Sequence, residues 1–341
     1  MFGDYSLYLV TGATGYLGQI VIRKLLDAGK SVRALVMPND PAVAELPKEA
    51  EIVVGDVTDA FSLPPFFAGE PEGYCVIHCA GIISIATRRN PKMWQVNVEG
   101  TKNVIHQCIF HHVARMICIG TVHTIPERQK GAILCETEDL SPRKVKGQYA
   151  KSKTVAAQYA LAAAKTGLHI SVVLPSGLIG PYDKGKGNIS SAILSFCQQK
   201  LPVAVKGGYD FADVRDVADG ILACCEKGRA GECYILSGHY ATLQDIFAHL
   251  SRAGYGKEPR YLPLWLIKTL SPFFELASLL RKEPLFLSPY SAAILGGNVR
   301  FSCKKAEREL DYHPRALEET LDDTVRWMEE EGLIPPKKKE K

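Results

Sequence analysis

A glycine-rich segment near the start constrains the fold of this chain more than any other stretch. The segment TGATGYLG at 11–18 follows a short apolar run and precedes an amphipathic run, which predicts a strand, a glycine turn and a helix. In such a turn Gly12 permits the sharp bend, Gly15 lets the backbone approach a pyrophosphate, and Gly18 lets the helix pack on the sheet. Glycine triplets alone are weak evidence, but here the strand, turn and helix fall where a phosphate site needs them.

Strand and helix patterns alternate through the first half of the chain. Strands are expected at 7–11, 31–36, 51–54, 74–79, 115–119 and 170–174, and helices at 16–28, 91–112 and 147–166. This alternation predicts right-handed crossovers and therefore an α/β fold with a Rossmann-type, doubly wound parallel sheet. Ligands of such sheets bind at the carboxyl ends of the strands.

The pattern loosens after Pro175. A helix is expected near 189–199, a strand near 203–205, a helix over 214–227 and a strand over 233–236, followed by mostly helical segments. We therefore expect an NAD(P)-binding domain over 1–175 and a smaller, mainly helical substrate lobe over 176–336, interleaved with the sheet. The basic residues 337–341 are expected to form a disordered tail.

Composition narrows the class of protein. The 341 residues carry a formal charge of +4, of which the four lysines and one glutamate of 337–341 supply +3, so no nucleic-acid surface is expected. The ten cysteines form no C-x-x-C pair and no zinc-like cluster, which predicts a reducing, cytoplasmic location and no metal site. The first strand begins at once, and no apolar run is long enough for a membrane span, so neither a signal peptide nor a transmembrane segment is expected.

The segment YAKSK at 149–153 carries the clearest chemical signal. Tyr149 and Lys153 lie four residues apart on an expected helix, so both side chains point the same way. A neighbouring ammonium favours the phenolate and lowers the pKa of a tyrosine, which makes Tyr149 a candidate general acid/base.

Together, TGATGYLG and YAKSK resemble the extended short-chain dehydrogenases/reductases, the superfamily of nucleotide-sugar epimerases, dihydroflavonol reductases and 3β-hydroxysteroid dehydrogenases. The resemblance extends from Leu7 to about Trp327 and is specific for the superfamily, but not for a substrate. It implies an NAD(P)-dependent enzyme with Tyr149 and Lys153 at its centre. It also implies a homodimer formed through the helices near 91–112 and 147–166.

The resemblance also implies roles for other positions. Thr121, in ICIGTVHT, would polarise the substrate carbonyl, where serine is commoner in the family. Asn97, in VNVEGT, would hold a helix bend and a proton-relay water. The other expected cofactor contacts are Gly12, Thr14, Gly15, Tyr16, Leu17, Gly18, Asp56, Val57, Cys79, Ala80, Gly81, Pro175 and Leu178.

Cofactor choice depends on the end of the second strand. NAD enzymes usually place an acidic residue there, but this chain has Val36 and Met37. The arginine of many related reductases is also missing at Met37, although Arg33 faces the same side of a strand of period two. Arg33 is thus either a phosphate ligand or a strand-edge charge, and NADP is preferred over NAD.

Two enzyme classes fit the second half of the chain. Nucleotide-sugar enzymes use arginines to neutralise a diphosphate, and Tyr209 stands where one such arginine is typical. This favours reduction of a carbonyl, or oxidation of an alcohol, on a hydrophobic small molecule. Arg215 and Arg300 remain, so an NAD-retaining sugar or nucleotide-sugar epimerase or dehydratase is the alternative.

A third hypothesis is a non-catalytic NADP-binding sensor or scaffold, which the presence of Tyr149, Lys153, Thr121 and Asn97 disfavours. His123, Ile83 and Tyr209 are candidate substrate residues, whereas His78 is expected to be packed in a strand. The broadly apolar segment 263–280 includes Trp265, Phe273, Phe274 and Leu276. It either packs the small lobe, covers an apolar substrate or contacts a membrane surface.

Overall fold

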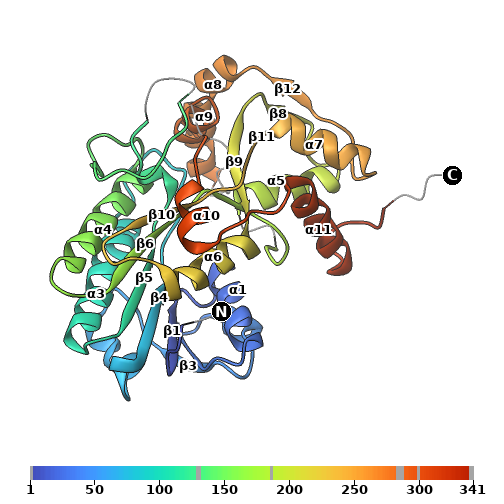
Figure 1. Ribbon diagram of the computed structural model, residues 1–341. Helices are drawn as coiled ribbons and strands as arrows, with labels where there is room; N and C mark the ends of the chain where they lie inside the picture. The colour runs from blue at the N-terminus through green and yellow to red at the C-terminus, as the bar shows by residue number, and fades with distance from the viewer. Residues whose placement is uncertain (1–2, 128–131, 185–186, 282–287, 298–299, 338–341) are drawn as a thin grey trace.

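The central element of the fold is a seven-stranded sheet in which every strand pair is parallel (Figure 1). The computed structural model describes residues 3–127, 132–184, 187–281, 288–297 and 300–337. The strands lie in the order β10-β6-β5-β4-β1-β2-β3. Their bounds are Leu7–Thr11 (β1), Val32–Val36 (β2), Glu51–Val54 (β3), Tyr74–His78 (β4), Arg115–Ile119 (β5), Ile170–Pro175 (β6) and Cys233–Leu236 (β10).

Helices cover both faces of this sheet. One face packs against α1 (Tyr16–Asp27), α6 (Val214–Lys227) and α10 (Lys304–Leu310), and the other against α3 (Thr101–Phe110) and α4 (Gln148–Ala164). The period of two along a strand explains the two layers: Leu9 of β1 packs into one, and its neighbours Tyr8 and Val10 into the other. The predicted doubly wound parallel sheet is confirmed.

The order of the strands reverses between β1 and β4. The chain runs outward from β1 to β2 and β3, and then crosses to β4, β5 and β6 on the other side. Crevices at such a switch point are the usual ligand sites of open α/β sheets. The glycine turn after β1 and the segment Cys79–Gly81 after β4 therefore meet at this position.

The second half of the chain builds a smaller lobe around two minor sheets. The sheet β11-β9-β7 joins His239–Thr242, Gly208–Asp213 and Gly177–Ile179, and the sheet β12-β8 joins Arg260–Leu262 and Val203–Val205. The helices of this lobe are α5 (Asn188–Cys197), α7 (Leu243–Arg252), α8 (Leu264–Arg281), α9 (Pro289–Leu295) and α11 (Leu317–Glu330). The region beyond 240 is thus mostly helical as predicted, but it also contributes β12 and most of β11.

The helix expected over 91–112 is divided by an irregular turn. It consists of α2 (Pro91–Trp94), a π-helical turn over Gln95–Gly100 and α3. A π-helical turn widens the helix locally and is frequent at functional sites. Short 3₁₀ turns complete the structure at Pro41–Glu45, Ala60–Ser62, Pro64–Phe67, Pro71–Gly73 and Val122–Thr124.

The apolar segment 263–280 forms most of α8 and is only partly packed. Ile267 is buried, whereas Trp265 is 69% exposed and Phe273 68% exposed. The side chains of Phe274 and Leu276, and the tail residues 338–341, lie outside the described part of the chain. Among the helices that the structure describes, none is long and apolar enough to cross a membrane.

Candidate active site

The glycine turn after β1 lies against the segment that follows β4. Gly12 has a φ of +65°, and a Cβ there would lie 2.6 Å from the Ala80 nitrogen. A Cβ on Gly18 would lie 2.2 Å from the Gly12 oxygen, so the helix can start this close to the strand only with glycine at both positions. No side chain caps the N-terminus of α1, and its first turn holds no acidic residue. These open N–H groups fit the pyrophosphate of a dinucleotide.

Other expected cofactor positions lie around this turn. Leu17 is buried in the layer beneath it, and the Tyr16 hydroxyl lies near Gly180 and the lobe residue Asp213. The Asp56 carboxylate, beyond β3, accepts a 2.8 Å hydrogen bond from the Thr58 N–H. Val57 packs near Gly100, Gly81 lies beside Lys153, Pro175 ends β6 and Leu178 lies in β7. Their contacts with a cofactor remain predictions.

Arg33 is not at the cofactor edge of the sheet, so of its two expected roles the structure favours the strand-edge charge over the 2′-phosphate ligand. The side chain lies near the start of β2, where Nε donates to the Glu51 carboxylate at 2.8 Å. Its NH1 group donates to the carbonyl oxygens of Phe66 and Ala68. The alternation of side chains along a strand predicts the face on which Arg33 lies, but not how close it lies to either end of β2. The edge where the cofactor is expected lies at the carboxyl end, beyond Val36.

An acidic residue that the sequence did not single out lies beside the glycine turn instead. Asp40 follows β2, caps the 3₁₀ turn Pro41–Glu45 through the Ala42 N–H, and accepts a 2.7 Å hydrogen bond from the Thr14 hydroxyl. The acidic residue of NAD enzymes usually stands at the end of the second strand, whereas Asp40 lies four residues beyond Val36. Only the folded loop shows that its carboxylate returns to the glycine turn.

Tyr149 and Thr121 come together at the carboxyl ends of β5 and β6. Tyr149 lies in the first turn of α4, and Thr121 follows β5. The Tyr149 side chain is buried, which raises its pKa to about 12, and a hydrogen bond with Thr121 acts in the opposite direction. Tyr149 is therefore a neutral phenol at physiological pH.

Lys153 lies one turn further along α4, but it does not lower the pKa of Tyr149 in the way the spacing predicts. Its Nζ donates a 2.7 Å hydrogen bond to the Ile119 carbonyl, and burial lowers the pKa of the ammonium. Lys153 also approaches Gly81, where a Cβ would lie 3.2 Å from Nζ. The ammonium thus faces the turn after β4, where cofactor contacts are expected.

Asn97 links three parts of the site. It lies in the π-helical turn, and its Nδ2 donates to the Ile82 carbonyl at 3.0 Å and to the Ser152 hydroxyl at 3.1 Å. Its Oδ1 accepts from the Ile82 N–H, and the Ser152 hydroxyl donates to the Tyr149 carbonyl. Asn97 therefore holds the loop after β4 against the first turn of α4.

His78 is structural, as predicted. Its ring is fully buried between the hydroxyl groups of Thr11 and Thr101, at 2.8 Å and 3.0 Å. Burial lowers its pKa to about 3, so the imidazole stays neutral and packs between β1 and the helix.

Aromatic side chains from distant segments surround Tyr149. The His123 ring stacks on Tyr209 with centroids 5.5 Å apart, and a 2.9 Å hydrogen bond joins His123 Nε2 and the Tyr209 hydroxyl. The centroids of Tyr149 and Tyr290 lie 6.2 Å and 6.1 Å from that of His123. Tyr290 was missed by the sequence analysis, because it lies on α9 far along the chain. Ile83 is 71% exposed, and its contact with a substrate remains a prediction.

The sequence left Arg215 and Arg300 as candidate ligands of a diphosphate, and the structure shows what each side chain contacts. Arg215 forms ion pairs with Asp213 and Asp323, both at 2.7 Å, and Arg300 lies over the ring of Tyr240 at 4.7 Å. The two carboxylates neutralise the charge of Arg215, whereas Arg300, which lies over a neutral ring, keeps its positive charge.

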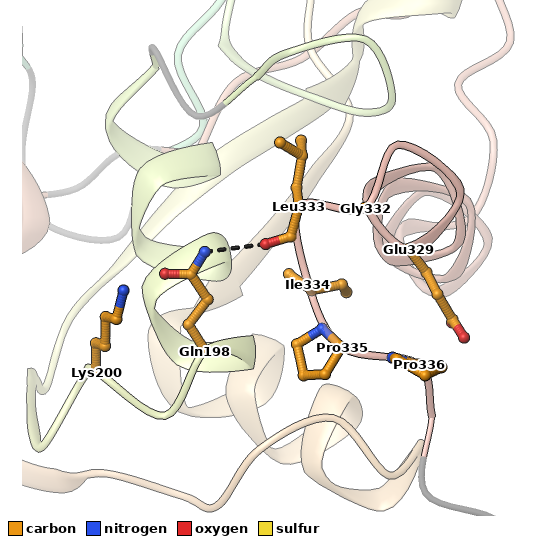
Figure 2. A pocket seen from close by; sticks show the side chains of 8 residues that line it. All are labelled: Gln198, Lys200, Glu329, Gly332, Leu333, Ile334, Pro335 and Pro336. Carbon is orange, nitrogen blue, oxygen red and sulfur yellow. Dashed lines mark hydrogen bonds between the residues drawn. The ribbon is translucent and has the colours of Figure 1, made fainter.

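Two cavities among the described residues differ in character. A cavity of about 40 Å³ is lined by His123 and Tyr290, among other residues. A larger, open groove of about 750 Å³ lies between the ends of α5 and α11 (Figure 2), where Gln198 donates to the Leu333 carbonyl at 2.9 Å. None of the predicted site residues lines the open groove, whereas His123 lines the small cavity together with Tyr290.

Comparisons with known proteins agree with this geometry. The family described as "NAD dependent epimerase/dehydratase family" matches residues 8–237. A putative dihydroflavonol 4-reductase of Synechocystis sp. is 31% identical, and the match covers 96% of each chain. Sterol demethylase protein B of Methylococcus capsulatus is 28% identical over 96% of this chain and 99% of its own. The crystal structure of gox2253 has a TM-score of 0.82 and 30% identity, over 96% of this chain and 99% of that one.

Proposed function

The chain belongs to the NAD dependent epimerase/dehydratase family and is an enzyme, and on this premise we propose that it reduces a carbonyl group on a hydrophobic small molecule. The observation that carries the proposal is the pairing of Tyr149 with Thr121 in a buried site walled by aromatic side chains. The reverse reaction, oxidation of the alcohol, uses the same groups.

The two hydroxyl groups act where negative charge develops. Tyr149 and Thr121 donate hydrogen bonds to the substrate oxygen, and Tyr149 transfers its proton to that oxygen as the carbonyl is reduced. The raised pKa of Tyr149 keeps the phenol protonated at neutral pH, which suits a proton donor better than a base. A nicotinamide cofactor supplies the hydride when it is bound.

The neighbouring side chains hold this pair in place. Lys153 would bind the cofactor ribose from the face of α4 that also carries Tyr149, close to Gly81. Asn97 is a positioning residue in this account, because it acts on Tyr149 through Ser152 and the first turn of α4. Its further role in holding a proton-relay water is part of the proposal.

An apolar substrate is favoured by the walls of the site. His123, Tyr209 and Tyr290 offer ring surfaces, and burial lowers the pKa of His123 to about 4, so the imidazole is neutral. The names of two relatives, a sterol demethylase protein and a putative dihydroflavonol reductase, refer to ring-containing molecules. Arg215 is ion-paired with Asp213 and Asp323, which argues against its use in binding the diphosphate of a nucleotide sugar.

We propose NAD as the cofactor, which reverses the order expected from the sequence. A 2′-phosphate near the end of β2 would meet the carboxylate of Asp40, held by the Thr14 hydroxyl. The arginine that was expected to bind this phosphate, Arg33, is hydrogen-bonded at the other end of the strand. Like charges brought close together repel, so the structure favours the cofactor without the phosphate.

The test is a spectrum of the purified protein, followed by titration with NADH and NADPH and a screen of apolar ketones and aldehydes. The proposal expects a protein free of retained cofactor that binds NADH more tightly than NADPH and consumes NADH with a ketone. Tightly retained NAD, with interconversion of nucleotide sugars and no net consumption of NADH, would overturn it.

A further inference from the structure

The hydroxyl group of Tyr290 is buried and has no hydrogen-bond partner among the described residues. The whole side chain is only 7% exposed, and burial raises the pKa of the phenol, so it remains a neutral hydrogen-bond donor. A buried hydroxyl without a partner destabilises a fold, and such groups in native proteins call for an explanation.

The position of Tyr290 is fixed by close packing against the start of α4. Gly147 has a φ of +83°, and a Cβ there would lie 2.3 Å from the Tyr290 ring. Gly147 precedes Tyr149 by two residues, so the two tyrosines are held on the same side of the site. The missing Cβ allows Tyr290 to approach the catalytic turn this closely.

The polar groups nearest to Tyr290 are already paired with each other. His123 Nε2 is joined to the Tyr209 hydroxyl at 2.9 Å, and Tyr149 is joined to Thr121. Tyr290 and His123 also line the cavity of about 40 Å³, which has room for a group of one or two heavy atoms. The Tyr290 hydroxyl is thus an unpaired, buried donor beside this cavity, whereas Glu127 and Lys146 of the cavity lining form an ion pair with each other at 2.6 Å.

We propose that Tyr290 is a specificity-determining residue that donates a hydrogen bond to a second oxygen of the substrate, separate from the carbonyl that is reduced. The inference rests on the proposed function and deepens it, because it narrows the substrate class to apolar ketones that carry a further hydroxyl or keto group. A site with an unpaired buried donor rejects an analogue that lacks the matching oxygen.

Tyr261 offers a matched control. Its hydroxyl also lacks a partner among the described residues, but it lies on β12, in the minor sheet with β8. Tyr290→Phe and Tyr261→Phe thus each delete a buried hydroxyl without a described partner, next to Gly147 and His123 in one case and on β12 in the other. Neither substitution breaks a hydrogen bond among the described residues. The melting temperature of both variants should therefore be equal to or above that of the wild type.

The experiment compares 1-decalone with a panel of hydroxy-1-decalones that differ only in the position of the hydroxyl group. The wild-type enzyme should favour at least one hydroxyketone over 1-decalone by about 10-fold or more in kcat/KM, mainly through KM. Tyr290→Phe should reduce this ratio to about 1, and Tyr261→Phe should keep it. A wild-type ratio near 1 across the panel, or an unchanged ratio in Tyr290→Phe, would overturn the inference.

Failure of the proposed function has a different signature. If the wild-type enzyme reduces none of these ketones, carbonyl reduction is not its reaction on this class. The dissociation constants of 1-decalone and of each hydroxy-1-decalone are then measured by calorimetry with NADH present, and their ratio replaces the ratio of kcat/KM. Tighter binding of a hydroxyketone that is lost only in Tyr290→Phe supports the inference, and equal binding of all the ketones overturns it.

Discussion

The Thr14 hydroxyl donates a 2.7 Å hydrogen bond to the Asp40 carboxylate, and this contact brings a negative charge to the glycine turn. The carboxylate is held from two directions, because it also accepts the Ala42 N–H. It lies beyond the end of β2, on the loop where cofactor choice is usually decided. This contact is the basis of our proposal that the cofactor is NAD, with a ribose hydroxyl rather than a ribose phosphate near Asp40.

Asp40→Asn should shift the cofactor preference towards NADP. The amide keeps an oxygen for the Ala42 N–H but removes the charge, so the ratio of kcat/KM for NADPH over NADH should rise by about 10-fold. Asp59→Asn is the control, because Asp59 caps another 3₁₀ turn through the Phe61 N–H. A ratio that stays constant in Asp40→Asn would show that Asp40 does not determine the choice.

Tyr149→Phe should lower kcat by about 10²- to 10⁴-fold and leave the dissociation constant of NADH within about 2-fold of the wild-type value. The hydroxyl is needed for proton transfer, whereas the ring and its packing remain. Tyr255→Phe is the control, since the Tyr255 hydroxyl binds Glu329 outside the site. Unchanged turnover in Tyr149→Phe would refute the catalytic assignment.

Thr121→Ala should lower kcat by about 10- to 100-fold, because the hydrogen bond to the developing oxyanion is lost in the transition state. Thr121→Ser should restore most of the rate, since serine retains the hydroxyl for Tyr149 and for the His123 N–H. Steady-state kinetics separates the roles: an Ala variant that raises only KM would place Thr121 in substrate binding rather than in catalysis.

The stability of the protein should fall in mild acid, partly because of His123. Burial lowers its pKa from about 6.5 to about 4, so folding favours the neutral ring. This contribution is complete above about pH 6.5 and is lost as the pH falls towards 4, at about 1.4 kcal/mol per pH unit. Urea unfolding between pH 7 and 4.5 should show a shallower pH dependence for His123→Gln than for the wild type.

The matched variant is His313→Gln, which replaces an exposed histidine. It should reproduce the wild-type slope of the unfolding free energy against pH. If His123→Gln gives the same slope as the wild type, the ring of His123 is not held neutral by the fold.

Local patterns predicted those parts of the site that lie on one element. The four-residue spacing of Tyr149 and Lys153 requires only a helix, and the glycine turn needs only the strand before it and the helix after it. The alternation of strands and helices likewise determines the main sheet, because crossovers have one hand.

Other parts depend on contacts that no local pattern records. Tyr290 reaches Gly147 and His123 from α9, and its only trace in the sequence is Gly147, whose missing Cβ makes room for the ring. Asp40 returns to Thr14 through a loop, and the pairing of Arg33 with Glu51 near the start of β2 depends on the neighbouring strand β3. Strands β9 and β11 pair across the smaller lobe, so neither is evident from its own residues.

The most direct test of the account is the fate of the transferred hydrogen. NADH labelled with deuterium at the transferable position is supplied with an apolar ketone that the enzyme accepts. We predict one deuterium at the carbinol carbon and one NADH consumed for each alcohol formed, with the alcohol formed about 10²- to 10⁴-fold more slowly by Tyr149→Phe. Conversion of a nucleotide sugar by the same preparation, with no deuterium in the product and no NADH consumed, would contradict it.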